Sequence, residues 1–368
     1  MSFMAVSTKQ MQQTCNKVLP NQKTNQVRVG SVLIGGGAPV VVQSMLNASP
    51  NSASDNLEQI KRLESAGCEV VRMAIPSMDC MSTFEEVCAK SPLPVVGDVH
   101  FNASIAIRSA KCGAAKLRIN PGNIGGLEKT KGVLEAANDA NIPIRIGVNA
   151  GSLDKKLAEN KNMSLPEKLA ASAVEYVQFC ESEGFTNLVV SAKAHDVCAT
   201  VETYRLLAKK IPHVPLHIGI TEAGTTFQGL IKSAAGLGIL LESGIGDTLR
   251  ISLTAPPEEE MQACWALLGA LNLRKRTPEI ISCPTCGRCK VNLIEIANAV
   301  QEKICSLNKP IKVAVMGCTV NGPGEAREAD IGIACGSGVG VIFKAGKTIR
   351  KVNENEMVNA LLEEVRKL

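Results

Sequence analysis

The sequence predicts an α/β protein in which a TIM (β/α)8 barrel is followed by a smaller α/β domain. Eight short apolar runs alternate with longer segments of helical period within about 250 residues, which is the pattern expected of such a barrel. No Gly-x-Gly-x-x-Gly turn follows the first run, which argues against a dinucleotide-binding open sheet. Periodicity alone still leaves a doubly wound sheet as the structural alternative.

The eight runs are mostly rich in Val and Ile, and such nearly continuous apolar character suits parallel strands that are covered on both faces. Between the runs, residues such as Leu57, Ile60 and Leu63 share one face at helical spacing. In chain order, the predicted strands are Val40–Met45, Val70–Ile75, Pro94–His100, Lys116–Asn120, Pro143–Asn149, Asn187–Lys193, Pro215–Thr221 and Thr248–Leu253.

A charged triplet at residues 274–276 follows a last helical stretch and precedes a region rich in cysteine. We therefore expect two domains, a barrel over residues 1–275 and a smaller α/β domain over residues 276–368. A chain of 368 residues is long enough for a large barrel and one appended domain.

Bulk composition limits the possible partners. Aromatic residues make up only 3% of the chain, and the formal net charge of +5 is spread among interspersed acids and bases, so we expect no nucleic-acid partner. The N-terminal residues do not resemble a secretory signal, and no run is long and apolar enough to span a bilayer. We therefore expect a cytoplasmic protein without a membrane partner, in which most of the 14 cysteines are free thiols or metal ligands.

Cationic residues recur where the predicted strands end. The carboxyl ends of parallel barrel strands surround one shared pocket, so residues far apart in sequence are expected to meet there. Several buried cations need an anion to offset their charge, and the planar fork of arginine suits a diphosphate better than a single carboxylate. Structural ion pairs with Asp98, Asp247 or Glu222 are the alternative. The cations are Arg72, Arg118, Arg145, Lys193 and Arg250, accompanied by Asn149, His217, Thr221 and Ser252.

Six cysteines fall between Cys283 and Cys335, and two of them, Cys283 and Cys286, form a Cys-x-x-Cys pair. Such a pair is shared by zinc ribbons, thioredoxin-like sites and iron-sulfur proteins. A zinc ribbon needs a second close pair, which does not follow here. The pattern therefore favours an iron-sulfur cluster with three thiolates and a fourth ligand that is not necessarily a thiolate. Either Cys289 or Cys318 could supply the third thiolate.

Longer motifs resemble those of the (E)-4-hydroxy-3-methylbut-2-enyl diphosphate synthase family, iron-sulfur reductases of the non-mevalonate isoprenoid pathway. They lie in family order between about Val27 and Arg350. The motifs begin at Leu117 (Leu-Arg-Ile-Asn-Pro-Gly-Asn), Ile144 (Ile-Arg-Ile-Gly-Val-Asn-Ala-Gly-Ser), Ile220 (Ile-Thr-Glu-Ala-Gly), Gly246 (Gly-Asp-Thr-Leu-Arg), Cys283 (Cys-Pro-Thr-Cys) and Gly317 (Gly-Cys-Thr-Val-Asn-Gly-Pro-Gly-Glu).

The resemblance implies a [4Fe-4S] cluster held by Cys283, Cys286 and Cys318, with Glu325 as an exchangeable fourth ligand and Cys289 as a bystander. It also implies an oxidoreductase that opens the ring of 2-C-methyl-D-erythritol 2,4-cyclodiphosphate with two electrons and removes water, giving 4-hydroxy-3-methylbut-2-enyl diphosphate. A ferredoxin or flavodoxin is the implied electron donor. In the family the barrel of one protomer faces the cluster of the other across a homodimer.

The resemblance further implies a set of substrate contacts and a candidate proton donor, Glu222. The pocket residues that match the family are Arg72, Arg118, Arg145, Asn149, Lys193, Thr221, Glu222, Arg250 and Ser252, with Asn321 from the smaller domain. One loop departs from the family pattern: the hydroxyl-rich and acidic stretch after the first strand is replaced by Leu46-Asn47-Ala48-Ser49-Pro50, in which only the Asn is kept.

Overall fold

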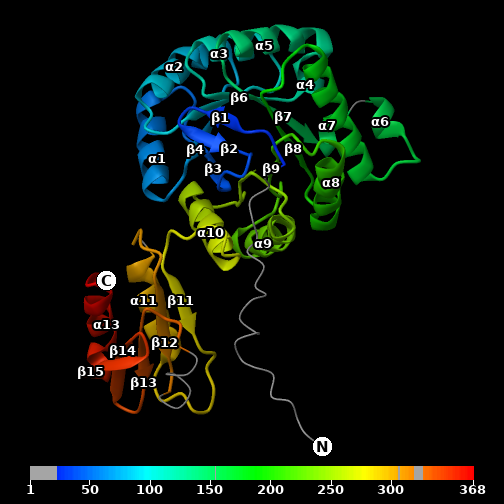
Figure 1. The fold of residues 1–368 in the computed structure, drawn as a ribbon. Helices are drawn as coiled ribbons and strands as arrows, with labels where there is room; N and C mark the ends of the chain where they lie inside the picture. Colours follow the sequence, from blue (N-terminus) through cyan, green and yellow to red (C-terminus); the bar gives the residue numbers. More distant parts are fainter. Residues whose placement is uncertain (1–22, 154, 306, 319–325) are drawn as a thin grey trace, which may run out of the picture. The chain divides into compact units, whose positions relative to one another are not determined.

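Eight parallel strands organise the first of the two units into which the chain divides. In the computed structural model, which describes residues 23–153, 155–305, 307–318 and 326–368, these units are Met1–Arg274 and Lys275–Leu368. Figure 1 shows the strands of the first unit enclosed by its helices. Each of the eight predicted runs contains one strand: β3 (Val41–Met45), β4 (Val70–Ala74), β5 (Val95–Asp98), β6 (Lys116–Ile119), β7 (Ile144–Asn149), β8 (Leu188–Lys193), β9 (His217–Ile218) and β10 (Thr248–Leu249).

The strand order confirms the predicted barrel. Neighbours along the sheet are β8-β7-β6-β5-β4-β3-β10-β9, all parallel, and an isolated parallel bridge between Val190 and Leu216 joins the two ends of the sheet. One long helix follows each strand, as a right-handed βα crossover requires. These helices are α1 (Ala53–Ser65), α2 (Met81–Lys90), α3 (Ala103–Lys111), α5 (Leu127–Asp139), α7 (Leu165–Ser182), α8 (Val197–Lys210), α9 (Thr226–Glu242) and α10 (Pro257–Ala270), with short α4 (Pro121–Ile124) and α6 (Lys155–Glu159) between them.

A hairpin closes the amino-terminal end of the barrel. Its strands, β1 (Val27–Val29) and β2 (Val32–Ile34), are antiparallel, and their buried side chains pack against valines from the first half of several barrel strands. The Asp247 carboxylate, just before β10, accepts hydrogen bonds from the Thr24 hydroxyl at 2.9 Å and from the Leu216 backbone N–H at 2.7 Å. The apolar hairpin therefore leaves only the opposite, carboxyl-terminal end for polar chemistry.

In its described part, the second unit is a five-stranded sheet with two α-helices. Strands β11 (Glu279–Ser282), β12 (Lys312–Met316) and β13 (Ile331–Cys335) are parallel, and β14 (Val339–Lys344) and β15 (Lys347–Asn353) continue the sheet in antiparallel order. Helices α11 (Leu293–Ile304) and α13 (Met357–Arg366) pack apolar residues such as Val300 and Leu361 against Val313 and Ile333. This unit has its own hydrophobic core.

None of the helices in the described ranges combines the length and the apolar character that crossing a bilayer requires.

The seam between β8 and β9 depends on one buried tyrosine. The Tyr204 hydroxyl on α8 donates to the His217 carbonyl at 2.7 Å and accepts from the Ala192 N–H at 3.3 Å. It thereby links the backbones of β8 and β9, and its side chain is fully buried.

We predict that Tyr204→Phe lowers the free energy of unfolding by about 1–3 kcal/mol, because two buried backbone groups lose a partner. Urea unfolding followed by circular dichroism measures this change. Ser182→Ala is the control, since among the described residues the Ser182 hydroxyl bonds only to the Phe179 carbonyl of the same helix, at an exposed position, and it should change stability by less than about 0.5 kcal/mol. Equal stability of Tyr204→Phe and the control would contradict the prediction.

Candidate functional site: a cationic barrel interior and a thiol-bearing sheet edge

Cationic side chains line the inside of the barrel. Side chains alternate between the two faces of a strand, so Lys116 and Arg118 on β6 share the inner face, as do Arg145, Gly147 and Asn149 on β7. A Cβ atom on Gly147 would lie 2.7 Å from the Arg118 Nε, so the absence of a side chain there makes room for the guanidinium. The cations in the described part of the barrel interior are Arg72, Lys116, Arg118, Arg145, Lys193 and Arg250.

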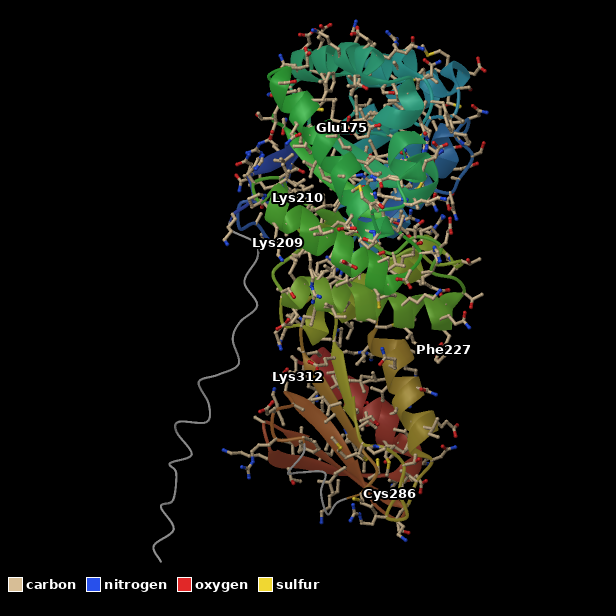
Figure 2. All side chains as sticks on the ribbon, turned by 90° about the vertical axis from the view of Figure 1, so that its right-hand side faces the viewer. Glu175, Lys209, Lys210, Phe227, Cys286 and Lys312 are labelled. Atoms are coloured by element: carbon tan, nitrogen blue, oxygen red, sulfur yellow. The ribbon has the colours of Figure 1, made fainter. Side chains whose placement is uncertain are left out.

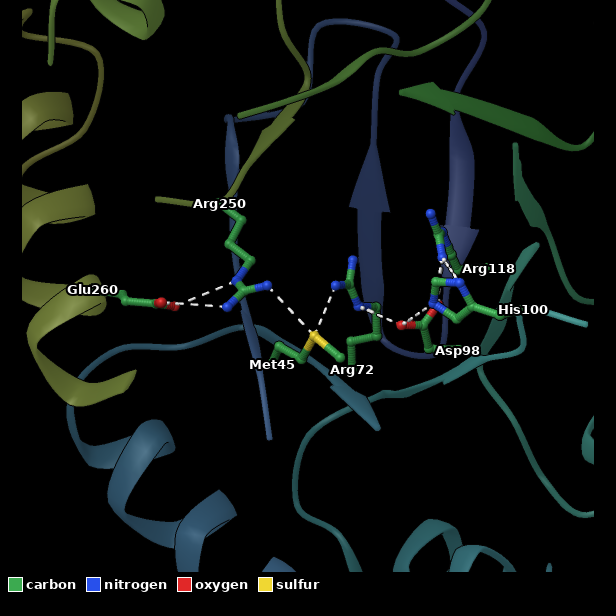
Figure 3. A network of polar contacts seen from close by, with 7 residues as sticks. All are labelled: Met45, Arg72, Asp98, His100, Arg118, Arg250 and Glu260. Carbon is green, nitrogen blue, oxygen red and sulfur yellow. Dashed lines mark hydrogen bonds and ion pairs between the residues drawn. The ribbon is translucent and has the colours of Figure 1, made fainter. Parts of the chain in front are cut away.

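Asp98 at the end of β5 is the central counter-charge. Its carboxylate lies 3.3 Å from the Arg72 Nε and 3.1 Å from the Arg118 Nη1, and His100 contacts it at 3.4 Å (Figure 3). Burial alone would raise the pKa of this carboxyl, but Arg72, His100 and Arg118 lower it overall. Asp98 is therefore a stable anion that holds two of the arginines.

Glu260 on α10 is the second counter-charge. Its buried carboxylate lies 3.3 Å from Arg250, and it also accepts the Leu253 backbone N–H at 3.1 Å. Between the two carboxylates, the Met45 Sδ accepts from the Arg72 Nη2 at 2.8 Å and from the Arg250 Nη1 at 3.4 Å (Figure 3). The network fixes the directions of both guanidinium groups.

The remaining cations lack such partners among the described residues. The Arg145 Nε and Nη1 atoms are buried without a hydrogen-bond partner there, and its pKa is lowered by burial and by Arg72 and Arg118. Lys193, at the end of β8, has its pKa lowered by burial and by the repulsion of Arg145, Arg72, Arg250 and Arg118. The described interior thus contains more positive charge than its two carboxylates can neutralise, which is the arrangement that an anionic ligand would complete.

The other predicted pocket residues lie at the same end of the barrel. Asn149 pairs in register with Lys193 at the ends of β7 and β8, and Thr221 and Ser252 are half-buried in the segments that follow β9 and β10. Glu222 is exposed and adopts a φ of 54°, in the left-handed region. In the described ranges it forms no ion pair, so the alternative that it neutralises a nearby arginine is not supported.

The other two acids that the sequence suggested as arginine partners differ in what they bind. Asp98 does bind Arg72 and Arg118, whereas the Asp247 carboxylate accepts bonds from Thr24 and Leu216. Burial raises the pKa of Asp247 to about 6. Glu260 was not expected as an arginine partner, because it is one of three consecutive glutamates that open α10, and the sequence does not distinguish which of them faces inward.

Lys116 was not among the predicted pocket residues. It is fully buried, and its Nζ has no partner among the described residues. The signal was present in the sequence, since a residue two positions before Arg118 on a strand must share its face.

In the second unit, the carboxyl ends of β11 and β12 bring two of the predicted thiols to one sheet edge. These strands are adjacent and parallel, Cys283 follows β11, and Gly317 and Cys318 follow β12. The Gly317 N–H donates to the Cys283 Sγ at 3.3 Å. Cys286 lies exposed in the loop after β11, at the opposite end of the sheet from Lys312, which begins β12 (Figure 2).

Cys289 lies close to the same edge. Its N–H donates to the Cys286 carbonyl at 2.9 Å, and its thiol donates to the Val291 carbonyl at 3.2 Å. A Cβ atom on Gly317 would lie 2.7 Å from the Cys289 Sγ, so this approach requires glycine. Geometry alone therefore does not separate Cys289 from Cys318 as a third ligand.

Two of the predicted site residues, Asn321 and Glu325, lie outside the described residues. Within the described residues, no three His, Cys, Asp or Glu side chains are gathered in a way that could hold a metal ion. The N–H to sulfur bond at Cys283 is nevertheless the type of contact that stabilises a cluster-ligating thiolate. The chemistry of the donor set therefore fits an iron-sulfur cluster.

The fold and the site define a two-unit TIM-barrel protein with a cationic barrel interior and a second α/β unit that carries thiols. Two protein-family models match the chain. The model described as "GcpE TIM-barrel domain" matches residues 24–265, and the model described as "GcpE protein C-terminal domain" matches residues 279–367. The chain belongs to the GcpE family.

Relatives named 4-hydroxy-3-methylbut-2-en-1-yl diphosphate synthase (flavodoxin) match along nearly their whole length. The protein of Geobacter sulfurreducens is 50% identical over 346 residues, covering 94% of this chain and 98% of the relative. The Aquifex aeolicus protein is 49% identical over 351 residues, covering 95% and 98%, and the Clostridium acetobutylicum protein is 48% identical over 343 residues, covering 93% and 98%. The family resemblance drawn from the sequence motifs is thus confirmed.

We predict that Asp98→Asn lowers the free energy of unfolding by about 3 kcal/mol, because two buried arginines lose their shared counter-charge. The pKa of Asp98 is lowered in the folded protein, so its contribution is present above the ordinary value of 3.8 and is lost as the pH falls below it. Chemical unfolding at pH 7 and at acidic pH measures both effects.

Glu86→Gln is the matched control, since Glu86 forms an exposed pair with Lys90 on α2 and should contribute less than about 0.5 kcal/mol. A stability difference between Asp98→Asn and the parent protein that stays constant down to strongly acidic pH would be inconsistent with this role of the carboxylate.

Proposed function

We propose that the protein reduces 2-C-methyl-D-erythritol 2,4-cyclodiphosphate to 4-hydroxy-3-methylbut-2-enyl diphosphate, a step of the non-mevalonate isoprenoid pathway. Relatives that are about half identical over nearly the whole chain carry the name of this synthase. The observation that carries the proposal in this chain is the cationic barrel interior, where Arg145 and Lys193 have no counter-charge of their own among the described residues. A diphosphate supplies the missing negative charge.

The barrel holds the substrate through its diphosphate. Among the described residues, Arg145 offers two buried donor atoms without partners, while Arg72, Arg118 and Arg250 are oriented by Asp98, Glu260 and Met45 before any ligand arrives. Preorganised donors of this kind stabilise negative charge as it develops on the leaving diphosphate oxygen. We assign the remaining substrate contacts to the polar groups at the strand ends, Asn149, Thr221 and Ser252, and the family resemblance adds Asn321 to this set.

Cys283, Cys286 and Cys318, with Glu325 as the fourth and exchangeable ligand, would hold a [4Fe-4S] cluster. When bound, such a cluster would relay two electrons, one at a time, from a flavodoxin or ferredoxin to the substrate. A carboxylate suits the fourth position because it is a harder ligand than a thiolate and is more readily displaced from iron. Cys283 suits a ligand role because the Gly317 N–H already points at its sulfur.

The reaction balances with two electrons and protons from the solvent. The carbon–oxygen bond to one end of the cyclic diphosphate breaks, and that oxygen stays on the diphosphate, which becomes a monoester. A second carbon–oxygen bond releases hydroxide, a carbon–carbon double bond forms between the two carbons, and a proton converts the hydroxide to water. Glu222 is our candidate for the proton donor, because it lies exposed in the segment after β9, next to the pocket residue Thr221.

The working enzyme is proposed to be a cytoplasmic homodimer. The proposal comes from the family that the sequence motifs resemble, in which the barrel of one protomer faces the cluster of the other. Sedimentation of the purified protein tests the oligomeric state.

The proposed activity is tested by incubating anaerobically purified protein with the cyclodiphosphate and a chemical reductant, and following product formation. Arg145→Met should weaken binding of the cyclodiphosphate by at least about tenfold, because it removes charge-assisted hydrogen bonds. Lys131→Met is the control, since Lys131 is an exposed residue paired with Glu183. Cyclodiphosphate that is bound but recovered unchanged under reducing conditions would argue for a binding protein rather than an enzyme.

The ligand assignment predicts that Cys318→Ser loses the cluster while Cys289→Ser keeps it. Iron and sulfide analysis, with the visible absorbance of anaerobically prepared protein, measures this difference. Because Cys289 lies at the same sheet edge and bonds to the Val291 carbonyl, the pair of variants forms a matched comparison. Equal loss in both would overturn the assignment, and zinc in place of iron and sulfide would overturn the cluster itself.

A further inference from the structure

A buried lysine lies deeper in the barrel than the proposed diphosphate contacts. Lys116 begins β6 and its side chain is fully buried. Its Nζ has no hydrogen-bond partner among the described residues. Strand alternation places it on the same inner face as Arg118 and one step nearer to the amino-terminal end of the barrel. A buried amine without a partner is costly, so its presence calls for a physical explanation.

The groups that face this amine are predominantly positive. Arg145 on β7 and Arg72 on β4 are the charges that act on it most strongly, and Lys116 in turn acts on His217 of β9. The carboxylate on the neighbouring strand β5, Asp98, is already occupied by Arg72 and Arg118. No carboxylate in the described ranges therefore pairs with Lys116.

Other buried polar atoms of the barrel strands are also without partners in the described structure. They include the Arg145 Nε and Nη1, the His217 Nε2 and both side-chain polar atoms of Gln43, all buried. Four strands, β3, β6, β7 and β9, thus contribute buried groups without partners in the described structure, and most of these atoms are donors. An acceptor that arrives from outside would satisfy them.

The charge state of Lys116 depends on that acceptor. Burial, together with Arg145 and Arg72, lowers the pKa of its amine well below the ordinary value. A bound dianion has the opposite effect, because a negative charge nearby favours the protonated amine. The pKa of Lys116 therefore rises when the pocket above it is filled.

We propose that Lys116 is a further positioning residue of the anion site, lying beneath Arg145, and that it takes up a proton when the diphosphate binds. The inference rests on the proposed substrate class. Lys116 supports the bound diphosphate through charge without contacting the reacting carbons, so it affects binding more than the chemical step.

Proton uptake by Lys116 makes the affinity for the ligand depend on pH in a definite direction. Lys116 has one pKa in the ligand-free protein and a higher one in the complex. At a pH below both values, Lys116 makes its full contribution to affinity, which is a factor of ten for each unit by which the ligand raises the pKa. As the pH rises between the two values the contribution falls, and above the bound value it vanishes. The affinity ratio of the parent protein to a Lys116→Met variant therefore falls with increasing pH.

Calorimetric titration of the full-length oxidised protein, without reductant, measures the proton count. The cyclodiphosphate is titrated in buffers of different ionisation enthalpy at several pH values, so that binding is observed without turnover. Lys116→Met should bind with fewer protons taken up than the parent protein, and with an affinity deficit that shrinks as the pH rises. Lys111→Met, which removes an exposed lysine of α3, should match the parent protein in both respects.

Lys116→Arg separates charge from structure. Its permanent charge should preserve affinity at high pH while contributing no proton uptake, which a merely space-filling role would not produce. Thermal unfolding of the free proteins checks that each variant folds, and Lys116→Met should be no less stable than the parent, since it removes an unpartnered buried amine. An unchanged proton count and an unchanged pH dependence in Lys116→Met would overturn the proposal.

Inorganic pyrophosphate, titrated in parallel, distinguishes this proposal from the proposed function. If pyrophosphate binds with Lys116-dependent proton uptake and the cyclodiphosphate does not bind, the substrate assignment fails while the role of Lys116 stands. If neither binds the parent protein, both fail.

Discussion

The structure depends on burying positive charge that its own acids only partly neutralise. Asp98 and Glu260 hold Arg72, Arg118 and Arg250, whereas Arg145 and Lys193 have no counter-charge of this kind in the described structure. Such a barrel is less stable empty than filled, because desolvated charge is costly and a bound anion offsets that cost. The ligand-free protein is thus less stable, but the donors of its pocket are already in place when a ligand arrives.

The surrounding fold offsets the free-energy cost of this buried charge. The apolar hairpin of β1 and β2 closes one end of the barrel, so polar side chains have only the other end from which to meet water. A large aliphatic core between the barrel and its helices offsets the electrostatic cost. The second unit has a separate core and places Cys283 and Cys318 where two parallel strands end. Each unit therefore presents its chemistry at strand ends.

Much of this could be predicted from the sequence, because strand patterning is local. The eight apolar runs located all eight barrel strands, and the recurrence of Arg and Lys near strand ends located the cationic interior. Glu260 could not be predicted as a partner of Arg250, since tertiary packing of α10 decides which of three glutamates faces inward. Lys116 could have been found from its spacing to Arg118. The roles of Glu325 and Asn321 rest on family resemblance, as both lie outside the described residues.

The shortness of β9 and β10 has a consequence for how the pocket adapts. Each contributes only two residues to the ladder, and one bridge with the Tyr204 hydroxyl spans the neighbouring seam. Beyond His217 and Ile218, the segment that carries Thr221 and Glu222 therefore lies outside the strand ladder, as does the segment that carries Ser252. The longer strands β4 to β8 thus hold most of the buried charge, whereas the outline of the pocket on the other side is set by loop backbone rather than by strand pairing.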